Sequence, residues 1–271
     1  MKLDTPIALL GAGKLGETLV RGLIDAGRVE PGRVVVTAAH REGPARLAAD
    51  LGVVAGATNR EAVRGAGLVI LSVKPQQVAS VLEDLRGVLE PNQLLVSVAA
   101  SVGTAFIESR LRGPVPVVRA MPNTPALIRR GMTALAPGSH AREEHLALTR
   151  SVFEAVGRVV VVDEKYMDAI TGLSASGPAF IFIVIESLAE GGVKAGLPRD
   201  LTTELAAQTV LGSGAMVIET GSHPALLKDQ VTTPAGCTID GILELEEGGL
   251  RVTLIKAVVK AAERARQLHA E

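Results

Sequence analysis

Short runs of Val, Ile and Leu recur through residues 1–163 and constrain the fold more than any other feature of the sequence. Polar residues do not alternate with the apolar ones inside these runs, which is typical of strands that helices cover on both faces. Helical segments separate the runs, and this βαβ rhythm predicts an α/β fold with a doubly wound, mostly parallel sheet. The expected strands are Ile7–Leu10, Val34–Thr37, Val53–Val54, Leu68–Val73, Leu94–Val98, Val115–Arg119, Thr133–Ala136 and Val159–Val162. The helices expected between them include Leu15–Ala26, Gln76–Val88 and Glu143–Val156.

The strand signal disappears after residue 163, so we predict two domains, 1–163 and an all-helical 164–271. The expected helices of the second domain are Glu164–Leu173, Pro178–Ala195, Pro198–Glu219 and Leu250–Leu268. The run Phe180–Ile185 is apolar all round its helix, and such a helix must be buried on every side. About a hundred residues can hardly surround it, which favours a subunit interface over a central helix in a monomeric bundle.

A glycine-rich loop follows the first expected strand and opens the first helix. Its sequence, Gly11-Ala12-Gly13-Lys14-Leu15-Gly16, has the spacing G-x-G-x-x-G. In this motif the first glycine permits a tight turn, the second lets a pyrophosphate approach the backbone, and the third lets helix and strand pack closely. Because strand, loop and helix agree, we predict a dinucleotide site that includes Leu10 and Gly11 through Gly16.

The end of the second strand indicates which dinucleotide binds. An NAD site usually has Asp or Glu there for the ribose 2′-hydroxyl. This strand ends Thr37-Ala38-Ala39-His40-Arg41, with no acid before Glu42. Arg41 suits a 2′-phosphate through charge-assisted hydrogen bonds. We therefore predict NADPH as the cofactor, with NADH as the second option, and place Thr37, Ala38, His40 and Arg41 at the site. In the plainer alternative, Arg41 begins a solvated helix.

Later strand ends offer further contacts, because the carboxyl ends of the strands line the ligand crevice in such sheets. Val73, Lys74 and Pro75 follow the fourth strand and Ala99 the fifth, and we expect all four near the cofactor. After the sixth strand, Met121-Pro122-Asn123-Thr124-Pro125 is stiffened by two prolines, and Asn123 is expected to face the substrate.

Two helix starts in the second part are expected to bind an anion such as a carboxylate. In Thr232-Thr233-Pro234-Ala235-Gly236-Cys237-Thr238-Ile239, Thr233 is the expected cap and Pro234 the first helical residue. Thr238 places a hydroxyl one turn inside this helix. In Ser174-Ala175-Ser176-Gly177-Pro178-Ala179, Ser176 is the expected cap. The lone Cys237 is expected to be a small buried side chain.

These segments together resemble the pyrroline-5-carboxylate reductase family over essentially the whole chain. The resemblance rests on the glycine loop, Val73-Lys74-Pro75, Met121–Pro125, Gly172–Ala179 and Gly191–Pro198. Its most specific part runs from His223-Pro224 through Leu227-Lys228-Asp229 to Ile239. Three places depart from the family pattern: Ala235 replaces a usual second glycine, Ser101 follows Ala99-Ala100 where a glycine is expected, and Thr37–Arg41 replaces the serine-rich turn that often meets the 2′-phosphate.

The resemblance implies a Rossmann domain followed by a helical dimerisation domain, with the helical domains of a homodimer interlocked and dimers assembling further into a decamer. It implies reduction of Δ1-pyrroline-5-carboxylate to L-proline, the last step of proline biosynthesis, with NAD(P)H. By the family pattern, Thr238 is the catalytic contact to the imine nitrogen and Asn59 touches the nucleotide. The residues expected around the imino acid are Asn123, Ser176, Gly177, Pro178, Val231, Gly236, Cys237 and Thr238.

Two other functions compete with this one. A β-hydroxyacid dehydrogenase also joins a Rossmann domain to a helical one, and would use Lys194 for proton transfer, but Thr233–Thr238 would then be unexplained. The other is a non-catalytic sensor that binds NADPH. It would need only one anion-binding helix start, so the presence of two argues against it.

Composition excludes several classes. The formal net charge of −1 gives no electrostatic case for nucleic acid or an anionic membrane. The longest apolar run, Ala179–Ile185, is too short to span a bilayer. A single cysteine allows no intrachain disulfide, and the scattered histidines show no metal-ligand spacing. With no signal-peptide pattern at its N-terminus, the protein is expected in the cytoplasm.

Overall fold

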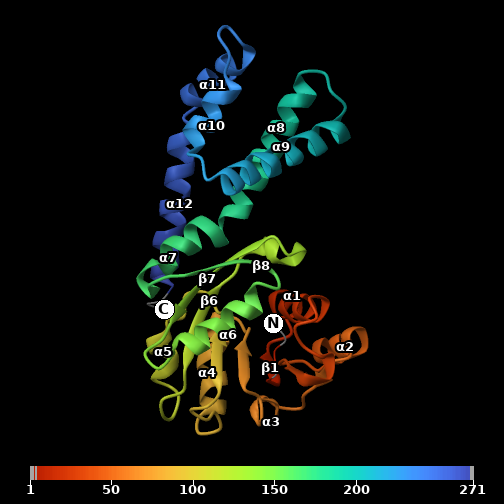
Figure 1. The fold of residues 1–271 in the computed structure, drawn as a ribbon, viewed down its shortest axis with the longest axis vertical. Coiled ribbons are helices and arrows are strands. Elements are labelled where there is room, and N and C mark those ends of the chain that lie inside the picture. The colour runs from red at the N-terminus through yellow and green to blue at the C-terminus, as the bar shows by residue number, and fades with distance from the viewer. Residues whose placement is uncertain (1–2, 4, 269–271) are drawn as a thin grey trace. The chain divides into compact units, whose positions relative to one another are not determined.

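The computed structural model describes residue 3 and residues 5–268, which form one sheet and a set of helices (Figure 1). The eight strands lie in the order β3-β2-β1-β4-β5-β6-β7-β8. Every neighbouring pair is parallel except β6 and β7, which are antiparallel. The strands are β1 (Ile7–Leu10), β2 (Val34–Thr37), β3 (Val54–Ala55), β4 (Leu68–Leu71), β5 (Leu94–Ser97), β6 (Val117–Met121), β7 (Gly131–Pro137) and β8 (Gly157–Val161). All eight expected strands are present: β1 and β2 have the expected bounds, and the ends of the other six differ from the expected ones by at most two residues.

Two hydrophobic cores lie on the two faces of this sheet. Strand β1 shows the division, since Ile7 and Leu9 join one core and Ala8 and Leu10 the other. The first core takes side chains from α1 (Lys14–Asp25), α2 (Glu42–Leu51) and α6 (Glu143–Phe153). The second takes them from α3 (Asn59–Val63), α4 (Pro75–Leu85) and α5 (Thr104–Glu108). Because both faces are covered, the strands need no polar alternation, as the sequence predicts.

The chain forms two compact units. The first extends to Ala175 and also holds the end of the last helix from Lys260 onward, and the second spans Ser176–Val259. These units differ from the predicted domains 1–163 and 164–271. The reason is that Met167 is fully buried against Met121, Ala134 and Ala136 of the sheet, which ties residues after 163 to the first unit.

The segment Glu164–Leu173 is not the single α-helix that the sequence predicts. It begins as a 3₁₀ turn (Glu164–Tyr166), becomes α7 (Met167–Ile170) and then widens into a π-helical turn (Thr171–Ala175). Two more 3₁₀ turns of the first unit are Pro31–Arg33 and Thr124–Ile128. Single π-turns are rare and occur often at functional sites.

The second unit is all helical, as predicted. Its helices are α8 (Gly177–Lys194), α9 (Arg199–Thr220), α10 (Pro224–Val231), α11 (Cys237–Glu247) and the first part of α12 (Leu250–Gln267). Helices α8 and α9 pack closely where Gly192 faces Thr202, because a Cβ at Gly192 would lie 2.6 Å from the Thr202 methyl carbon. An ion pair of 2.5 Å between Glu190 and Arg199 joins the same two helices.

Candidate active site

The glycine loop is joined to the strands on both sides of β1. The Gly11 N–H donates to the Thr37 carbonyl at 2.9 Å, and the Ser72 N–H donates to the Leu10 carbonyl at 2.7 Å. Gly11 has φ of +112°, and a Cβ there would lie 2.2 Å from the Ser72 carbonyl oxygen. A Cβ at Gly16 would lie 2.3 Å from the Gly11 carbonyl oxygen. Gly11 and Gly16 are therefore required by the turn and by close packing.

Gly13 has a different reason to be glycine. It is the N-cap of α1, with φ of −78° and ψ of 178°, a conformation open to any residue. No described heavy atom beyond its chain neighbours lies within 4 Å of the position that its Cβ would take. The free space stands over the N-terminus of α1, where backbone N–H groups and the helix dipole favour an anion. This local geometry fits a dinucleotide pyrophosphate.

The residues predicted to bind the cofactor lie at one edge of the sheet. The glycine loop, Thr37–Arg41, Val73–Pro75 and Ala99 each follow one of the adjacent parallel strands β1, β2, β4 and β5. Arg41 and His40 are exposed there. Asn59, the first residue of α3, is joined to this edge because the Thr37 hydroxyl donates to its Oδ1 at 2.6 Å.

A hollow of about 270 Å³ opens beside the glycine loop. The first turns of α1 contribute Lys14, Leu15 and Thr18, and Ala175 of the π-turn also lines it. The loop after β6 contributes Pro122, Asn123, Thr124, Ala126 and Leu127. The sequence did not single out Thr18, although it follows Lys14 by one helical turn and its hydroxyl donates to the Lys14 carbonyl at 2.7 Å.

Asn123 uses its amide within the protein. Its Oδ1 accepts a hydrogen bond from the Met132 N–H at 2.8 Å. Its Nδ2 lies 3.2 Å from the Ser174 carbonyl oxygen and 3.4 Å from the Ser174 hydroxyl. These hydrogen bonds give Asn123 a role that the sequence does not predict, in which it joins the loop after β6 to β7 and to the π-turn.

A buried polar network supports the neighbouring loop after β5. Arg119 of β6 is 2% exposed, and its Nη1 lies 3.4 Å from Oε1 of Glu164. Glu164 also accepts hydrogen bonds from the Thr104 N–H at 2.8 Å and hydroxyl at 2.5 Å, at the start of α5. Ser101 has φ of +58°, which explains why the family pattern has glycine there, and its hydroxyl donates to the Ala265 carbonyl of α12 at 3.1 Å.

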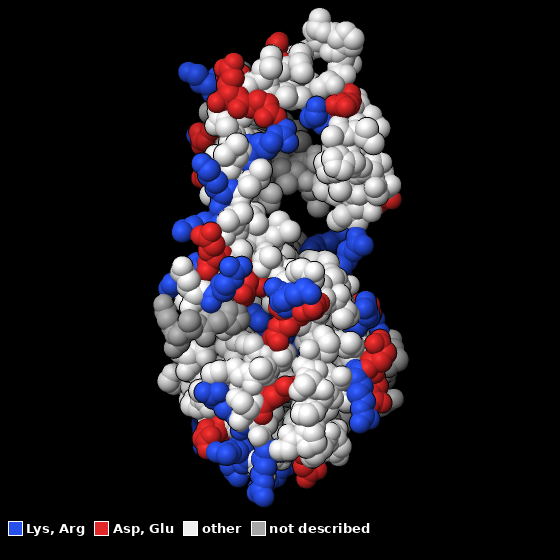
Figure 2. All heavy atoms as spheres, turned by 90° about the vertical axis from the view of Figure 1, so that its left-hand side faces the viewer, with Lys and Arg blue, Asp and Glu red and all other residues white. Residues whose placement is uncertain are grey.

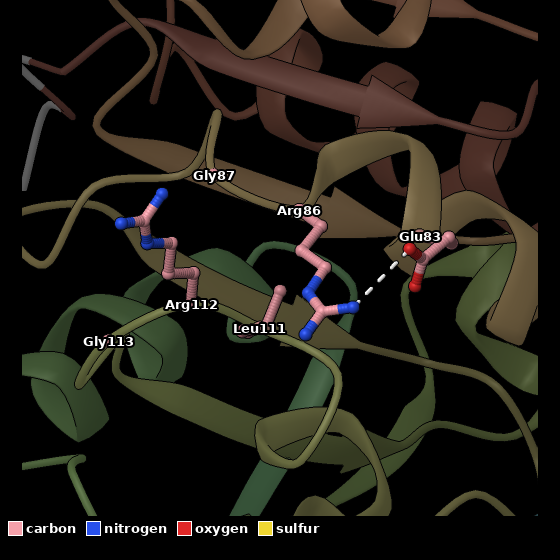
Figure 3. A pocket seen from close by; sticks show the side chains of 6 residues that line it. All are labelled: Glu83, Arg86, Gly87, Leu111, Arg112 and Gly113. Carbon is pink, nitrogen blue, oxygen red and sulfur yellow. Dashed lines mark ion pairs between the residues drawn. The ribbon is translucent and has the colours of Figure 1, made fainter.

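The pocket in Figure 3 does not belong to this site. It lies between the turn after α4 and the turn before β6, lined by Arg86, Gly87, Leu111, Arg112 and others. These turns lie at the amino ends of the strands, whereas the glycine loop lies at the carboxyl ends. Glu83 already pairs with Arg86 across 3.5 Å, as the dashed line in Figure 3 shows.

In the second unit, α11 begins later than the sequence predicts. Gly236 is its N-cap and Cys237 its first residue, so Pro234 is not helical and Thr233 is not the cap. A β-turn comes first: the Gly236 N–H donates to the Thr233 carbonyl at 3.0 Å, and Ala235 has φ of +57°. Residues with a Cβ adopt this conformation rarely, which explains why the family usually has a glycine in place of Ala235.

Thr238 and Cys237 therefore occupy the first turn of α11, where backbone N–H groups have no partner within the helix. Other helical threonines of the chain, such as Thr18 and Thr149, donate their hydroxyl to the carbonyl four residues earlier. The Thr238 hydroxyl makes no hydrogen bond to any described residue. Cys237 is exposed, so the prediction that it is buried is wrong for the single chain.

Ser176 does not cap a free helix end, contrary to the sequence prediction. It has helical φ and ψ of −84° and −27° and makes no capping hydrogen bond, because the chain arrives from the π-turn already helical. Gly177 and Pro178 are the first residues of α8, and Val231 is the exposed last residue of α10. Lys194, the lysine of the rival dehydrogenase hypothesis, ends α8 and is exposed.

The helices of the second unit expose many large apolar side chains. Phe182 and Ile183 of α8 are 60% and 61% exposed in the single chain. Others are Leu211 and Ile218 of α9, Leu243 of α11 and Ile255 of α12. By length and composition alone, the helical stretch Glu164–Lys194 could also cross a membrane. Exposed apolar surface spread over several helices is typical of a protein–protein interface.

Figure 2 shows Lys and Arg side chains interspersed with Asp and Glu over the face that it draws. Among residue 3 and residues 5–268, no group of three His, Cys, Asp or Glu side chains could hold a metal ion.

Comparisons with known proteins agree with this arrangement. Residues 164–268 match the family model for pyrroline-5-carboxylate reductase dimerisation, and residues 6–101 match that for NADP oxidoreductase, coenzyme F420-dependent. A pyrroline-5-carboxylate reductase of Arabidopsis thaliana is 45% identical over 97% of this chain and 95% of its own length.

Solved structures are similar over the full length. The pyrroline-5-carboxylate reductase of Coxiella burnetii has a TM-score of 0.92 at 36% identity, covering 98% of this chain and 99% of that one. The Plasmodium falciparum pyrroline carboxylate reductase, solved with NADP bound, has a TM-score of 0.89 at 26% identity, covering 99% of this chain and 100% of that one. By sequence and by fold, this chain belongs to the pyrroline-5-carboxylate reductase family.

Proposed function

We propose that this protein reduces Δ1-pyrroline-5-carboxylate to L-proline with NAD(P)H, the last step of proline biosynthesis. Family membership supports the activity. The structural observation that carries it is the first turn of α11, where neither the Cys237 and Thr238 N–H groups nor the Thr238 hydroxyl has a hydrogen-bond partner among the described residues. A cyclic imino acid needs both features, because its carboxylate is an anion and its ring nitrogen must be hydrogen-bonded during reduction.

Each residue then has a defined task. The backbone around Gly236, Cys237 and Thr238 holds the substrate carboxylate, with help from the turn Ser176–Pro178. The Thr238 hydroxyl orients the C=N bond and polarises it at nitrogen, and that nitrogen takes its proton from water as the adjacent carbon gains the hydride. The bound nicotinamide nucleotide supplies that hydride. Most of the acceleration comes from holding the two reactants in register.

For the cofactor, the proposal is a preference for NADPH over NADH. Arg41 and His40 are exposed after β2, and no carboxylate precedes Glu42 there. A guanidinium in this position binds a 2′-phosphate and gives no acceptor to a ribose 2′-hydroxyl. The glycine loop, Asn59, Lys74 and Ala99 would hold the rest of the nucleotide.

For the assembly, the proposal is a cytoplasmic homodimer with interlocked helical domains that assembles further into a decamer. The exposed apolar side chains of α8, α9, α11 and α12 support burial against a second copy of the chain. Such a partner also accounts for the apolar stretch Glu164–Lys194 without a membrane.

The test is an assay of purified protein with pyrroline-5-carboxylate and each nucleotide, followed by the loss of NAD(P)H absorbance. Replacing Thr238 by Ala removes one hydrogen bond worth roughly 1–3 kcal/mol, so we expect kcat/KM to fall about 5- to 150-fold with a normal fold. Thr238→Ser keeps the hydroxyl and is expected to keep most of the activity. Wild-type kinetics in Thr238→Ala would remove Thr238 from catalysis, and nucleotide binding with no imine turnover in the wild type would favour a sensor.

A further inference from the structure

The Asn123 side chain is hydrogen-bonded to the π-turn that precedes α8. Its amide donates to Ser174 and accepts from Met132, so a single side chain joins three segments that are far apart in sequence. An amide is well suited to this position, because one end must donate and the other must accept within the span of a short side chain.

The frame around Asn123 is rigid. Pro122 and Pro125 fix two backbone torsions of its loop. The 3₁₀ turn Thr124–Ile128 packs directly on the start of β7, since a Cβ at Gly131 would lie 2.9 Å from the Cα and Cβ of Ala126. The hydrogen bond from Met132 then sets the direction of the Asn123 amide and points Nδ2 at Ser174.

The partner of this amide is the π-turn Thr171–Ala175. In a continuous α-helix from α7 to α8, every turn would have the same number of residues. A π-turn adds one residue to a turn and so changes the direction of the side chains that follow it. Ser174 is the fourth of its five residues, and the proposed substrate turn Ser176–Pro178 begins two residues later. Ala175 lines the same hollow as Asn123 and Lys14.

We propose that Asn123 is a positioning residue: it holds the π-turn through Ser174 and thereby sets the placement of Ser176, Gly177 and Pro178 toward the substrate. It acts through this backbone and not by touching the imino acid, and is thus an alternative to the direct contact that the sequence predicts for Asn123. The inference rests on the proposed function for the identity of the substrate. The hydrogen bonds that carry it are independent of any ligand.

The experiment compares Asn123→Asp and Asn123→Ser with the wild type in the full-length protein. The Asp variant keeps an acceptor for Met132 but sets a carboxylate oxygen against the Ser174 carbonyl, and the Ser variant is too short to reach either partner. Arg130→Gln, an exposed change in the same loop, is the matched control. Kinetics are measured separately for pyrroline-5-carboxylate and for NADPH, and amide hydrogen exchange is followed over residues 171–180.

In both Asn123 variants we expect kcat/KM for the imine to fall roughly 10- to 100-fold, while the KM for NADPH changes less than about threefold. Exchange of the amides in residues 171–180 should become faster in the absence of any substrate. The Arg130→Gln control should match the wild type in all three measurements.

Unchanged exchange over residues 171–180 in both variants would overturn the proposal, as would wild-type kinetics for the imine. A variant that loses imine turnover without faster exchange would instead identify Asn123 as a direct ligand. A wild-type protein that does not reduce pyrroline-5-carboxylate would reject the proposed function. Amide exchange needs no turnover, so it would still show whether Asn123 holds the π-turn through Ser174. If the Asp variant does not fold, the neutral Ser variant decides the question.

Discussion

Gly11 and Gly13 of the G-x-G-x-x-G loop should respond differently to the same added methyl group. At Gly11, alanine would adopt φ of +112° with its Cβ 2.2 Å from the Ser72 carbonyl oxygen. The strained backbone alone costs about 1–3 kcal/mol, and the overlap adds to it. For a protein of this size, about 2 kcal/mol lowers the melting temperature by roughly 4–8 °C.

At Gly13 the same methyl group meets open space in a conformation that alanine adopts freely. The loss of glycine at an N-cap costs about 1 kcal/mol or less, so the melting temperature should fall by no more than about 2–4 °C. The methyl group would, however, stand where the pyrophosphate must approach the backbone. We expect the Kd for NADPH to rise at least about tenfold, which corresponds to about 1.4 kcal/mol.

The assay pairs thermal unfolding followed by circular dichroism with NADPH titration by calorimetry. Gly11→Ala should lose stability, and Gly13→Ala should lose binding while it stays folded. NADPH bound by Gly13→Ala with the wild-type Kd would refute the assignment of the free space to the pyrophosphate. A wild-type melting temperature for Gly11→Ala would refute the packing argument.

Three further results are expected. Arg41→Ala should raise the KM for NADPH roughly 10- to 100-fold by the loss of a charge-assisted contact, with little effect on NADH; equal losses would contradict a 2′-phosphate contact. Phe182→Glu places a charge on the exposed apolar face of α8 and should shift the protein toward monomers in light scattering, whereas an unchanged oligomer would place the interface elsewhere. The hydrogen bond from Arg46 lowers the pKa of Glu17 to about 2, so this pair stabilises the fold above the ordinary pKa of 4.5 and loses its effect as the pH falls toward 2. Arg46→Gln should therefore melt below the wild type at about pH 6 and together with it near pH 2, and a gap that persists at the lower pH would argue against this pair as its cause.

Local pattern was enough to determine the fold class and the nucleotide loop. Short apolar runs such as Leu68–Leu71 and Leu94–Val96, repeated between helical segments, indicate strands covered on both faces. The spacing of Gly11, Gly13 and Gly16 between such a run and a helical segment indicates a nucleotide-binding turn. The all-apolar start of α8 likewise indicated a partner before any surface was known. These features depend on residues close in sequence.

Tertiary structure decided the details of the substrate side, because they depend on partners far along the chain or on backbone torsions that composition does not reveal. The start of α11 moved from Pro234 to Cys237 since Ala235 adopts a left-handed conformation. Ser176 is not the cap that the sequence predicts, because the π-turn before it is already helical and continues into α8. The two partners of the Asn123 amide are 9 and 51 residues away, and no periodicity links such distant positions.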